Sequence, residues 1–226
     1  MSFHFDKSNA FCISLLSKPE RWARMEARFA HFGLECNRWI ATTPDLVTDT
    51  FYDYLNGGQR ACGQSHINVW RHIIANDLPY ALVLEDDAMF DKDWMSKLPF
   101  ENGTFSYCDE VATDRVDGDW DLFLLNASEP ITPQGHWLTV QEQYLTGGYI
   151  ISRAGAEHLL NSFAGCYASS DWMTSRLQCR GRSYSYFPWL VIQEGTESTI
   201  GSGYEADHAK VIRCLGEANY DIGNYV

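Results

Sequence analysis

The sequence predicts a single α/β domain: a Rossmann-like arrangement in which helices flank a mainly parallel, mixed central sheet. Short apolar runs typical of buried strands alternate along the chain with segments of helical periodicity. One of these runs, residues 80–84, is apolar without interruption, as expected of a strand covered on both faces. The 226 residues can bury a sizeable core, and they contain no internal repeat or clear linker. We therefore assign residues 1–226 to one domain.

The first elements form a β-α-β unit. Residues 11–16 (FCISLL) predict a strand, and Ser17 and Pro19 suit the start of the helix that follows. The apolar face of this helix holds Trp22, Met25, Phe29 and Phe32. Its other face holds the charged residues Glu20, Arg21, Arg24 and Arg28. Gly33 suits the end of the helix, and a second strand is expected near 35–41.

A second helix and a buried strand follow. The helix is expected over about 65–76, with Ser65 as its N-cap. The strand is the apolar run at 80–84 (YALVL), and it ends abruptly in three acids, Glu85, Asp86 and Asp87. These carboxylates are therefore expected at the carboxyl end of a buried strand.

The second half of the chain continues the alternation. Polar stretches at 101–118 and 127–135 predict loops, and 195–226 is a glycine-rich tail of weak periodicity. Strands are expected near 121–126, 136–141, 146–152 and 184–193, and helices near 154–163 and 170–179.

Charge and cysteine content exclude several classes of protein. The net charge is −13, so the surface repels nucleic acid and anionic lipid, and we expect no nucleic-acid partner. No stretch approaches the ~20 apolar residues of a membrane helix, and the start lacks a signal-peptide run, so no membrane span is expected. Seven cysteines without a Cys-x-x-Cys pair fit a reducing, cytoplasmic compartment.

The acidic triplet is the strongest candidate for chemistry. Three adjacent carboxylates repel one another unless a cation or hydrogen-bond donors hold them. Mg²⁺ or Mn²⁺ would meet that need, because both prefer oxygen ligands, and ligands of open α/β sheets bind beyond the carboxyl ends of strands. The alternative is that Glu85 and Asp87 are solvated loop acids while Asp86 caps a helix near residue 91. The residues alone leave both interpretations open.

Two further places have a functional and a structural interpretation. Ser65 and His66 lie where a helix is expected to begin, and free N–H groups there would favour an anion; taken alone, the segment favours a glycine-rich turn with a capping serine and a hydrogen-bonded histidine. Asp171 lies in the first turn of a predicted helix, where it could act as a general base or simply stabilise the helix.

Five segments together resemble glycosyltransferase family 25, which includes lipopolysaccharide β-galactosyltransferases and procollagen galactosyltransferases. In order, they are ISLLSKPERWARMEARFAHFGL, GQRACGQSHINVW, LPYALVLEDDAMF, WDLFLLN and GGYIISRAGAEHLL. The resemblance spans residues 12 to about 200, and the pairing of the second segment with the Glu-Asp-Asp block is fairly specific. One departure is Ala61, where the family usually has glycine.

The resemblance implies a GT-A fold, a UDP-sugar donor and a Mn²⁺ (or Mg²⁺) ion between the protein and the diphosphate. Residues carried over to the nucleotide and donor are Ser14, Leu15, Arg21, Ser65 and His66. Glu85, Asp86 and Asp87 become the metal motif, with Asp87 as the expected direct ligand because the general pattern is Asp-x-Asp. Asp171 becomes the candidate base. His208 is a candidate to complete the metal shell or to cover the donor, and the tail 195–226 that contains it is expected to cover the donor site.

The function implied is metal-dependent, inverting transfer of a hexose, of the galactose or glucose class, to a hydroxyl of a glycan or protein-linked acceptor. Two alternatives stay open: a glycoside hydrolase, whose paired carboxylates lie about 5 to 10 Å apart, and a non-catalytic domain that binds a nucleotide sugar. The loops at 101–118 and 127–135 would flank the acceptor. Trp137, Tyr149, Trp172 and Trp189 are candidates for stacking on sugars, although core packing explains any single one of them.

Overall fold

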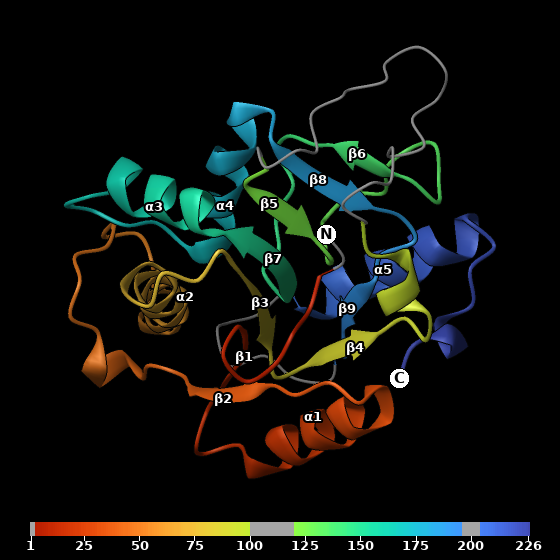
Figure 1. Cartoon of the computed structure of the whole chain (residues 1–226), viewed down its shortest axis with the longest axis horizontal. Helices are drawn as coiled ribbons and strands as arrows, with labels where there is room; N and C mark the ends of the chain where they lie inside the picture. The colour runs from red at the N-terminus through yellow and green to blue at the C-terminus, as the bar shows by residue number, and fades with distance from the viewer. Residues whose placement is uncertain (1–2, 100–119, 196–203) are drawn as a thin grey trace.

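The computed structural model describes residues 3–99, 120–195 and 204–226 (Figure 1). Within them, a seven-stranded sheet has the order β2-β1-β3-β7-β5-β8-β6. Its strands are β1 (Ala10–Ser14), β2 (Asn37–Ile40), β3 (Tyr80–Glu85), β5 (Leu122–Leu124), β6 (Trp137–Thr139), β7 (Gly148–Ser152) and β8 (Ser183–Tyr186). A separate pair joins β4 (Ala88–Phe90) to β9 (Val191–Gln193).

The sheet is mainly parallel, as predicted. Strand β1 runs parallel to β2 and to β3, and β5 runs parallel to β8. Strand β7 is antiparallel to both of its neighbours, β3 and β5, and β6 is antiparallel to β8. Val83 in the middle of β3 pairs with Phe11 of β1 and with Tyr149 of β7, which fixes the register on both sides.

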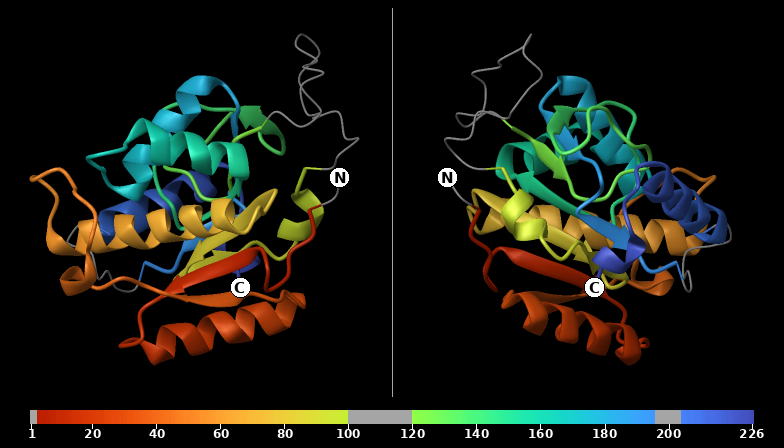
Figure 2. Two further views of the ribbon diagram at one scale, coloured as in Figure 1. Left: turned by 60° about the vertical axis from the view of Figure 1, so that its left-hand side comes forward. Right: turned by 90° about the vertical axis from the view of Figure 1, so that its right-hand side faces the viewer.

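Helices cover both faces of this sheet (Figures 1 and 2). One face packs against α2 (Gly57–Ala75), α3 (Arg153–Ser162) and α4 (Ser170–Leu177), and the other packs against α1 (Pro19–Phe32) and the β4-β9 pair. Helix α5 (Tyr204–Glu217) lies near the C-terminus. The remaining elements are short 3-10 turns: η1 (Pro44–Leu46), η2 (Trp94–Lys97), η3 (Gln178–Arg180) and η4 (Ile222–Asn224).

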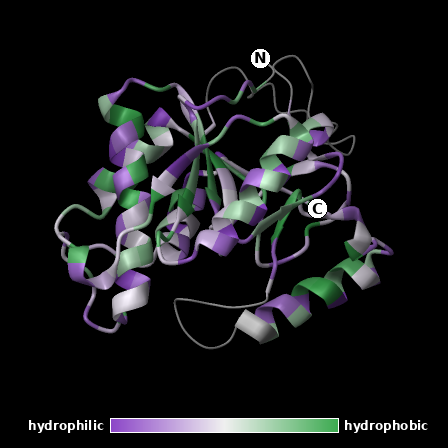
Figure 3. Cartoon of the chain, turned by 90° about the horizontal axis from the view of Figure 1, so that it is seen from below, coloured by the Kyte–Doolittle hydropathy of each residue, from purple (hydrophilic) through white to green (hydrophobic). Residues whose placement is uncertain are grey.

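The two faces are built by alternate residues of the same strands. In β1, Phe11 packs toward the α2 side whereas Cys12 packs toward the α1 side, because successive side chains of a strand point in opposite directions. Val83 and Leu84 divide in the same way in β3. Figure 3 shows hydrophobic residues concentrated on the central strands, while the helices carry mixed faces. This two-sided burial explains why the predicted strands are continuous apolar runs.

Helix α2 corrects a prediction, because it begins eight residues before Ser65. Its N-cap is Asn56, which accepts a hydrogen bond from the backbone N–H of Gln59, while the Gln59 side chain accepts one from the backbone N–H of Asn56. This capping box starts the helix inside the glycine-rich stretch. Within the helix, Gly63 packs closely against Phe51: a Cβ at this position would lie only 2.9 Å from the Phe51 ring, so a larger residue would not fit without a shift. Ser65 and His66 are therefore interior helical residues without free N–H groups for an anion.

Other boundaries also differ from the prediction. Lys18 rather than Ser17 is the N-cap of α1, although Pro19 and Gly33 take their expected places. The expected strand at 184–193 is two strands, β8 and β9, separated by a segment that contains Pro188, which has no N–H to give to a sheet. Asp86 is not a helix cap: strand β4 begins at Ala88, and the next helical turn, η2, has Asp93 as its N-cap.

The tail holds a helix that the sequence analysis did not predict. In α5, Val211, Cys214 and Leu215 are buried against the core, at the i, i+3, i+4 spacing of a helical face. The expected loop at 101–118 lies outside the described residues. In the part of the chain that the structure describes, no helix has the length and apolar content needed to cross a membrane.

Candidate active site

A pocket of about 120 Å³ opens where the carboxyl ends of β1, β2 and β3 meet. Parallel strands place the residues that follow them at one edge of a sheet, and this is where ligands of open α/β sheets bind. The lining residues are Ile13, Leu15, Arg21, Ala41, Thr42, Pro44, Gly58, Ala61, Cys62, Ser65, Glu85 and Asp86. The structure thus brings together five of the predicted site residues: Leu15, Arg21, Ser65, Glu85 and Asp86.

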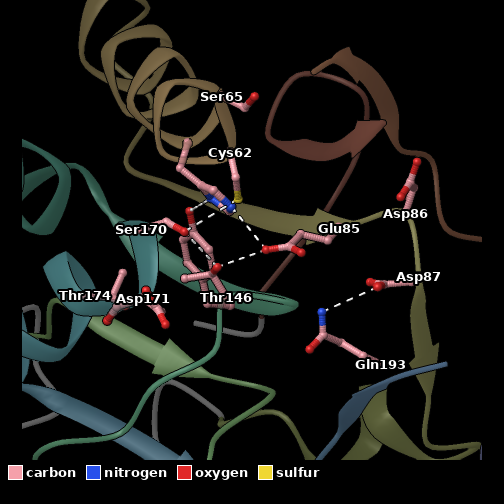
Figure 4. A network of polar contacts seen from close by, with 12 residues as sticks. Cys62, Ser65, Glu85, Asp86, Asp87, Thr146, Ser170, Asp171, Thr174 and Gln193 are labelled. Atoms are coloured by element: carbon pink, nitrogen blue, oxygen red, sulfur yellow. Dashed lines mark hydrogen bonds and ion pairs between the residues drawn. The ribbon is translucent and has the colours of Figure 1, made fainter. Parts of the chain in front are cut away.

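The acidic triplet at the end of β3 divides into two groups. Glu85 turns toward α2 and β7, where its Oε1 accepts a hydrogen bond from Thr146 Oγ1 (2.9 Å) and lies 3.3 Å from His66 Nε2. Asp86 and Asp87 turn the other way, and Figure 4 shows Asp87 facing Gln193. The three carboxylates therefore do not converge on one point.

Asp86 and Asp87 both form ion pairs with the same side chain, that of Arg21. Arg21 Nη2 lies 2.6 Å from Asp86 Oδ1 and 3.2 Å from Asp87 Oδ2. The Arg21 and Asp86 residues are only 5% and 6% exposed, so this ion pair is screened little by solvent. Arg21, on the charged face of α1, thus turns inward to the acids and lines the pocket.

Arg24 and Arg28 extend the same row of α1 toward the end of β9. Both contact Glu194: Arg24 Nη2 lies 3.0 Å from its Oε2, and Arg28 Nη2 forms an ion pair with its Oε1. Burial works to raise the pKa of Glu194, but these two guanidinium groups outweigh it, so the pKa is lowered. Three arginines on one helix therefore hold three carboxylates from two separate segments.

Burial and mutual repulsion set the protonation of the acids. The pKa of Asp87 is raised to about 7 by burial and by the negative charge of Glu85, against the opposing charge of Arg21. Burial also raises the pKa of Asp86. For Glu85, burial works in the same direction, but the hydrogen bonds that His66 and Thr146 donate outweigh it and lower the pKa. Glu85 is thus the fixed negative charge, and Asp87 is the carboxyl that titrates near neutral pH.

His66 is fully buried and holds Glu85 in place. The Trp70 indole donates to the Tyr149 hydroxyl (3.0 Å), since an indole nitrogen is only a donor. The Tyr149 hydroxyl then donates to His66 Nδ1 (2.8 Å), which leaves the Nε2 proton for Glu85 Oε1. With this tautomer, each polar atom of the series has a partner. His66 does not line the pocket, so it acts on the site through Glu85.

Ser14 and Ser65 are occupied by structural hydrogen bonds. The Ser65 hydroxyl donates to the Ala61 carbonyl and accepts from the backbone N–H of Thr42, both at 2.8 Å. Ser14 Oγ accepts from Arg38 Nη2 (3.2 Å), and the same nitrogen donates to the carbonyl of Leu15 (3.0 Å). These residues shape the wall of the pocket by fixing the loops that follow β1 and β2.

Asp171 lies in the first turn of α4, as predicted, and is half-buried. Its Oδ1 accepts from the backbone N–H of Trp172 (2.8 Å). The preceding residue, Ser170, lies 3.1 Å from Thr146 Oγ1, which in turn donates to Glu85. Figure 4 shows Asp171 and Asp86 on opposite sides of this hydrogen-bonded series. The residue that precedes the candidate base is thus linked to Glu85 through two hydroxyl groups.

His208 lies on α5, packed against Gly195. Gly195 has a positive φ of +67°, and a Cβ there would collide with the imidazole of His208. The neighbouring residue Glu194 donates its backbone N–H to the Asp87 carbonyl (2.9 Å). The tail is thus attached near the acidic segment, but no direct contact joins His208 to Asp86 or Asp87 among the described residues.

The aromatic residues suggested for sugar stacking belong to the core. Tyr149 and Trp189 have no exposed surface, and Trp137 is 6% exposed. Trp172 is half-buried, and its ring lies beneath the Arg176 guanidinium, 4.5 Å from the ring centroid. Core packing, the alternative given above, explains all four.

Sequence reasoning missed several residues of the site. Thr146 and Ser170 link Glu85 to α4, and Glu194 joins the site to α1. A signal for Thr146 was available, because it directly precedes the Gly147-Gly148 pair at the start of a predicted strand. For Glu194 the only signal is its place after the last predicted strand.

Comparison with known proteins identifies the relatives of this chain. Residues 7–116 match the sequence profile of glycosyltransferase family 25 (LPS biosynthesis protein). The chain is 30% identical over 257 residues to the lacto-N-neotetraose biosynthesis glycosyltransferase LgtE of Neisseria meningitidis serogroup B, covering 94% of this chain and 88% of that protein. It is 31% identical over 116 residues to procollagen galactosyltransferase 1 of Danio rerio, covering 48% of this chain and 18% of that protein.

The relatives differ in length and in activity. The chain spans most of LgtE but only about a fifth of the procollagen galactosyltransferase. Another relative, 29% identical and covering 67% of this chain and 28% of that protein, is the "Probable inactive glycosyltransferase 25 family member 3" of Bos taurus. The near full-length match to LgtE, the α/β fold and the pocket at the strand ends lead to one conclusion: this chain is a glycosyltransferase and belongs to glycosyltransferase family 25.

Proposed function

We propose that this protein is a metal-dependent, inverting hexosyltransferase that uses a UDP-sugar, of the galactose or glucose class, and a glycan or protein-linked hydroxyl as acceptor. The observation that carries the proposal is the pocket at the ends of β1, β2 and β3, with Asp86 and Arg21 in its wall. A pocket of this kind combines apolar surface with a few placed polar groups, as small-molecule sites do. The names of the relatives, which include galactosyltransferases and a lacto-N-neotetraose biosynthesis enzyme, support galactose and a lipopolysaccharide-type glycan.

Asp86 and Asp87 fit a hard divalent cation such as Mn²⁺ or Mg²⁺. Asp86 Oδ2 and Asp87 Oδ1 are buried and have no hydrogen-bond partner within the described part of the chain. Two adjacent carboxylates with unpaired oxygens are a suitable ligand set for such an ion, which also takes oxygens from the phosphates of a substrate. When bound, the ion would supply Lewis-acid stabilisation of the leaving diphosphate. His208 is a further candidate ligand in this proposal.

Arg21 gives this acidic protein a local positive charge at the donor site. The chain carries a net charge of −13, so an anionic donor needs nearby cationic groups. In the free protein Arg21 neutralises Asp86 and Asp87. A guanidinium has five N–H donors, so the same side chain can also hydrogen-bond to a diphosphate oxygen.

Asp171 is the proposed general base. An inverting transfer requires a carboxylate that takes the proton of the attacking hydroxyl from the side opposite the leaving group. Asp171 lies on α4, across the Ser170-Thr146-Glu85 series from the proposed diphosphate site at Asp86 and Asp87.

The alternative of a non-catalytic domain that binds a nucleotide sugar is kept because one relative is named as inactive. In either case we propose that residues 1–226 act as one domain and that the tail 195–226 covers the donor. The attachment of Glu194 to α1 and to the Asp87 carbonyl supports this place for the tail.

Calorimetry and a transfer assay test the proposal. UDP, UDP-galactose and UDP-glucose are titrated into the protein with Mn²⁺ and then with a chelator, and NMR of the product gives its anomeric configuration. We expect much weaker UDP binding after chelation and an inverted product. Equal UDP affinity with and without Mn²⁺ would contradict metal dependence. A product with retained anomeric configuration would contradict the inverting mechanism. Donor binding without transfer to any acceptor would favour the non-catalytic domain.

A further inference from the structure

Three different metal-binding groups meet beside the pocket. Cys62, His66 and Glu85 each place one ligand atom so that the sulfur, the nitrogen and the oxygen all lie within 4.8 Å of one another. Cys62 and His66 are four residues apart on α2 and therefore lie on one face of the helix, one turn from each other. Glu85 reaches them from the end of β3, and Figure 4 shows Cys62 on the helix and Glu85 on the strand. Two rigid elements thus fix the arrangement.

The orientation of His66 suits a metal on Nε2. Its Nε2 lies on the side of Glu85, while Nδ1 lies 2.8 Å from the Tyr149 hydroxyl. Histidine ligands of metals almost always use their second nitrogen in a hydrogen bond that fixes the ring. A metal on Nε2 would move the imidazole proton to Nδ1. The Tyr149 oxygen has two lone pairs, so it can accept this proton's hydrogen bond together with the one from Trp70.

Charge favours a divalent ion at these three residues. The three groups offer a thiol, an imidazole and a carboxylate. An ion of charge +2 that displaces the thiol proton to solvent would face one thiolate and one carboxylate. The sum of these charges is zero, which avoids leaving an unpaired charge in a buried place.

The pocket gives such an ion a route and an open position. Cys62 and Glu85 both line the pocket, whereas His66 lies behind them with no exposed surface. Three protein ligands with one side open to solvent is a common arrangement for Zn²⁺, which takes a water as its fourth ligand. The Cys62 thiolate would also make the site selective for Zn²⁺, because sulfur ligands favour Zn²⁺ over Mn²⁺ or Mg²⁺.

We propose that Cys62, His66 and Glu85 form a binding site for Zn²⁺, separate from the hard-cation site proposed at Asp86 and Asp87. The two sites lie on opposite sides of the β3 end, because Glu85 turns toward α2 while its two neighbours turn toward Arg21. The proposal does not depend on the identity of the donor, since it concerns the metal alone.

Cobalt provides a direct probe of the sulfur ligand. Co²⁺ is titrated into the full chain without nucleotide, and absorbance is recorded before and after addition of Zn²⁺. We expect a sulfur-to-cobalt charge-transfer band in the near ultraviolet, together with the strong visible bands of a four-coordinate ion, and Zn²⁺ should remove both. Cys62→Ser should abolish the ultraviolet band and weaken Zn²⁺ binding, measured against a competing chelator, at least about tenfold.

Three variants make the test specific. Cys179→Ser, which removes an exposed cysteine far along the chain, should keep the band and so excludes adventitious thiol binding. Glu85→Gln keeps a hydrogen-bond acceptor for Thr146 but removes the carboxylate charge, and it should weaken Zn²⁺ binding even if Cys62→Ser does not fold. Asp87→Asn should keep the Co²⁺ band while it loses Mn²⁺-dependent UDP binding.

The outcomes separate this proposal from the proposed function. A band that persists in Cys62→Ser, a band lost in Cys179→Ser, or Zn²⁺ affinity unchanged in Glu85→Gln would each overturn the site. No band in the wild-type protein at saturating Co²⁺ would also overturn it. Loss of Mn²⁺-dependent UDP binding concerns only the hard-cation site at Asp86 and Asp87. If either the Zn²⁺ site or the hard-cation site is disproved, the other can therefore still be tested.

Discussion

The Nη2 atom of Arg21 lies 2.6 Å from Oδ1 of Asp86, and both residues are almost completely buried. This pair explains how a chain of net charge −13 keeps adjacent carboxylates inside the protein. The guanidinium also reaches Asp87, so a single cation serves two acids. Removing it would leave two buried carboxylates without their nearest positive charge.

Arg21→Gln should therefore destabilise the protein strongly. Breaking a buried ion pair by removal of one partner typically costs about 3–5 kcal/mol. Arg24→Gln is the matched control, because the Arg24 side chain is 39% exposed and such a pair contributes about 0–1 kcal/mol. Urea unfolding at neutral pH with a chelator present measures both. Equal losses for the two variants would show that the Arg21 pair is not a main source of stability.

The stability of the metal-free protein should depend on pH through Asp87. The pKa of this carboxyl is raised from 3.8 to about 7 by burial and by Glu85, so between these values the folded protein binds more protons than the unfolded chain. The free energy of unfolding then falls as the pH rises through this window. Asp87→Asn removes the titration, so the variant should gain stability relative to wild type from about pH 4 to about pH 8.

Urea unfolding of both proteins across this pH range, in chelator, tests the expectation. The same substitution at the exposed Asp53 controls for the loss of one negative charge from an acidic chain. A difference between Asp87→Asn and wild type that stays constant with pH would contradict the raised pKa of Asp87.

His66→Ala should reduce stability because the imidazole is completely buried and has two hydrogen-bonded neighbours. The change opens a cavity and removes one hydrogen-bond partner each from Glu85 and Tyr149, which keep Thr146 and Trp70, for a loss of about 2–4 kcal/mol in the free energy of unfolding. The half-buried His72 on the same helix provides the control, His72→Ala. Donor affinity measured per folded molecule then decides the role: if it is unchanged, His66 is purely structural.

Asp171→Asn should separate chemistry from binding. The amide keeps an oxygen that can accept the hydrogen bond from the Trp172 N–H, so folding and Mn²⁺-dependent donor binding should persist. Sugar transfer should fall roughly 10²–10⁴-fold, the usual effect of losing a positioned base. A transfer rate close to that of wild type would mean that Asp171 only stabilises the start of α4. The base would then be sought at Glu85, at Glu194 or among the acids of 101–118.

Gly195→Ala should disturb the attachment of the tail. The position needs a positive φ of +67°, and the new Cβ would collide with the His208 ring. If the tail covers the donor, UDP affinity should fall while the rest of the fold persists. Gly216→Ala is the control within α5: no atom lies within 4 Å of its Cβ, so it should stabilise the helix by about 0.5–1 kcal/mol. Unchanged UDP affinity in Gly195→Ala would place the tail outside the donor site.

The sequence predicted the fold well where local pattern and burial agree. The run at 80–84 and its acids became β3 and the segment after it, because a strand buried on both faces must be apolar and polar groups can only follow its end. The start of α2 was not predicted, because the capping box of Asn56 and Gln59 competes with a more visible serine at 65. Helix α5 was missed because its buried face is short, formed by Val211, Cys214 and Leu215, and follows a glycine-rich stretch.

The site could be predicted as a set of residues but not as a set of contacts. Leu15, Arg21 and Asp86 were placed near the donor by family resemblance, and they do line one pocket. The divergence of Glu85 from Asp86 was not predictable, because adjacent residues share a segment of sequence and only tertiary partners decide their directions. Those partners, His66 and Thr146, come from α2 and from the segment just before β7.

One row of α1 carries Arg21, Arg24 and Arg28, at the i, i+3, i+7 spacing of a single helical face. Two of these arginines hold Glu194 beside the tail and one holds the acids after β3, so the helix cannot shift without moving all these contacts together. The backbone amides of α1 should therefore exchange with deuterium at a rate that reports whether a donor is bound. Exchange measured on this peptide segment would give a label-free assay of ligand occupancy, before any acceptor is known.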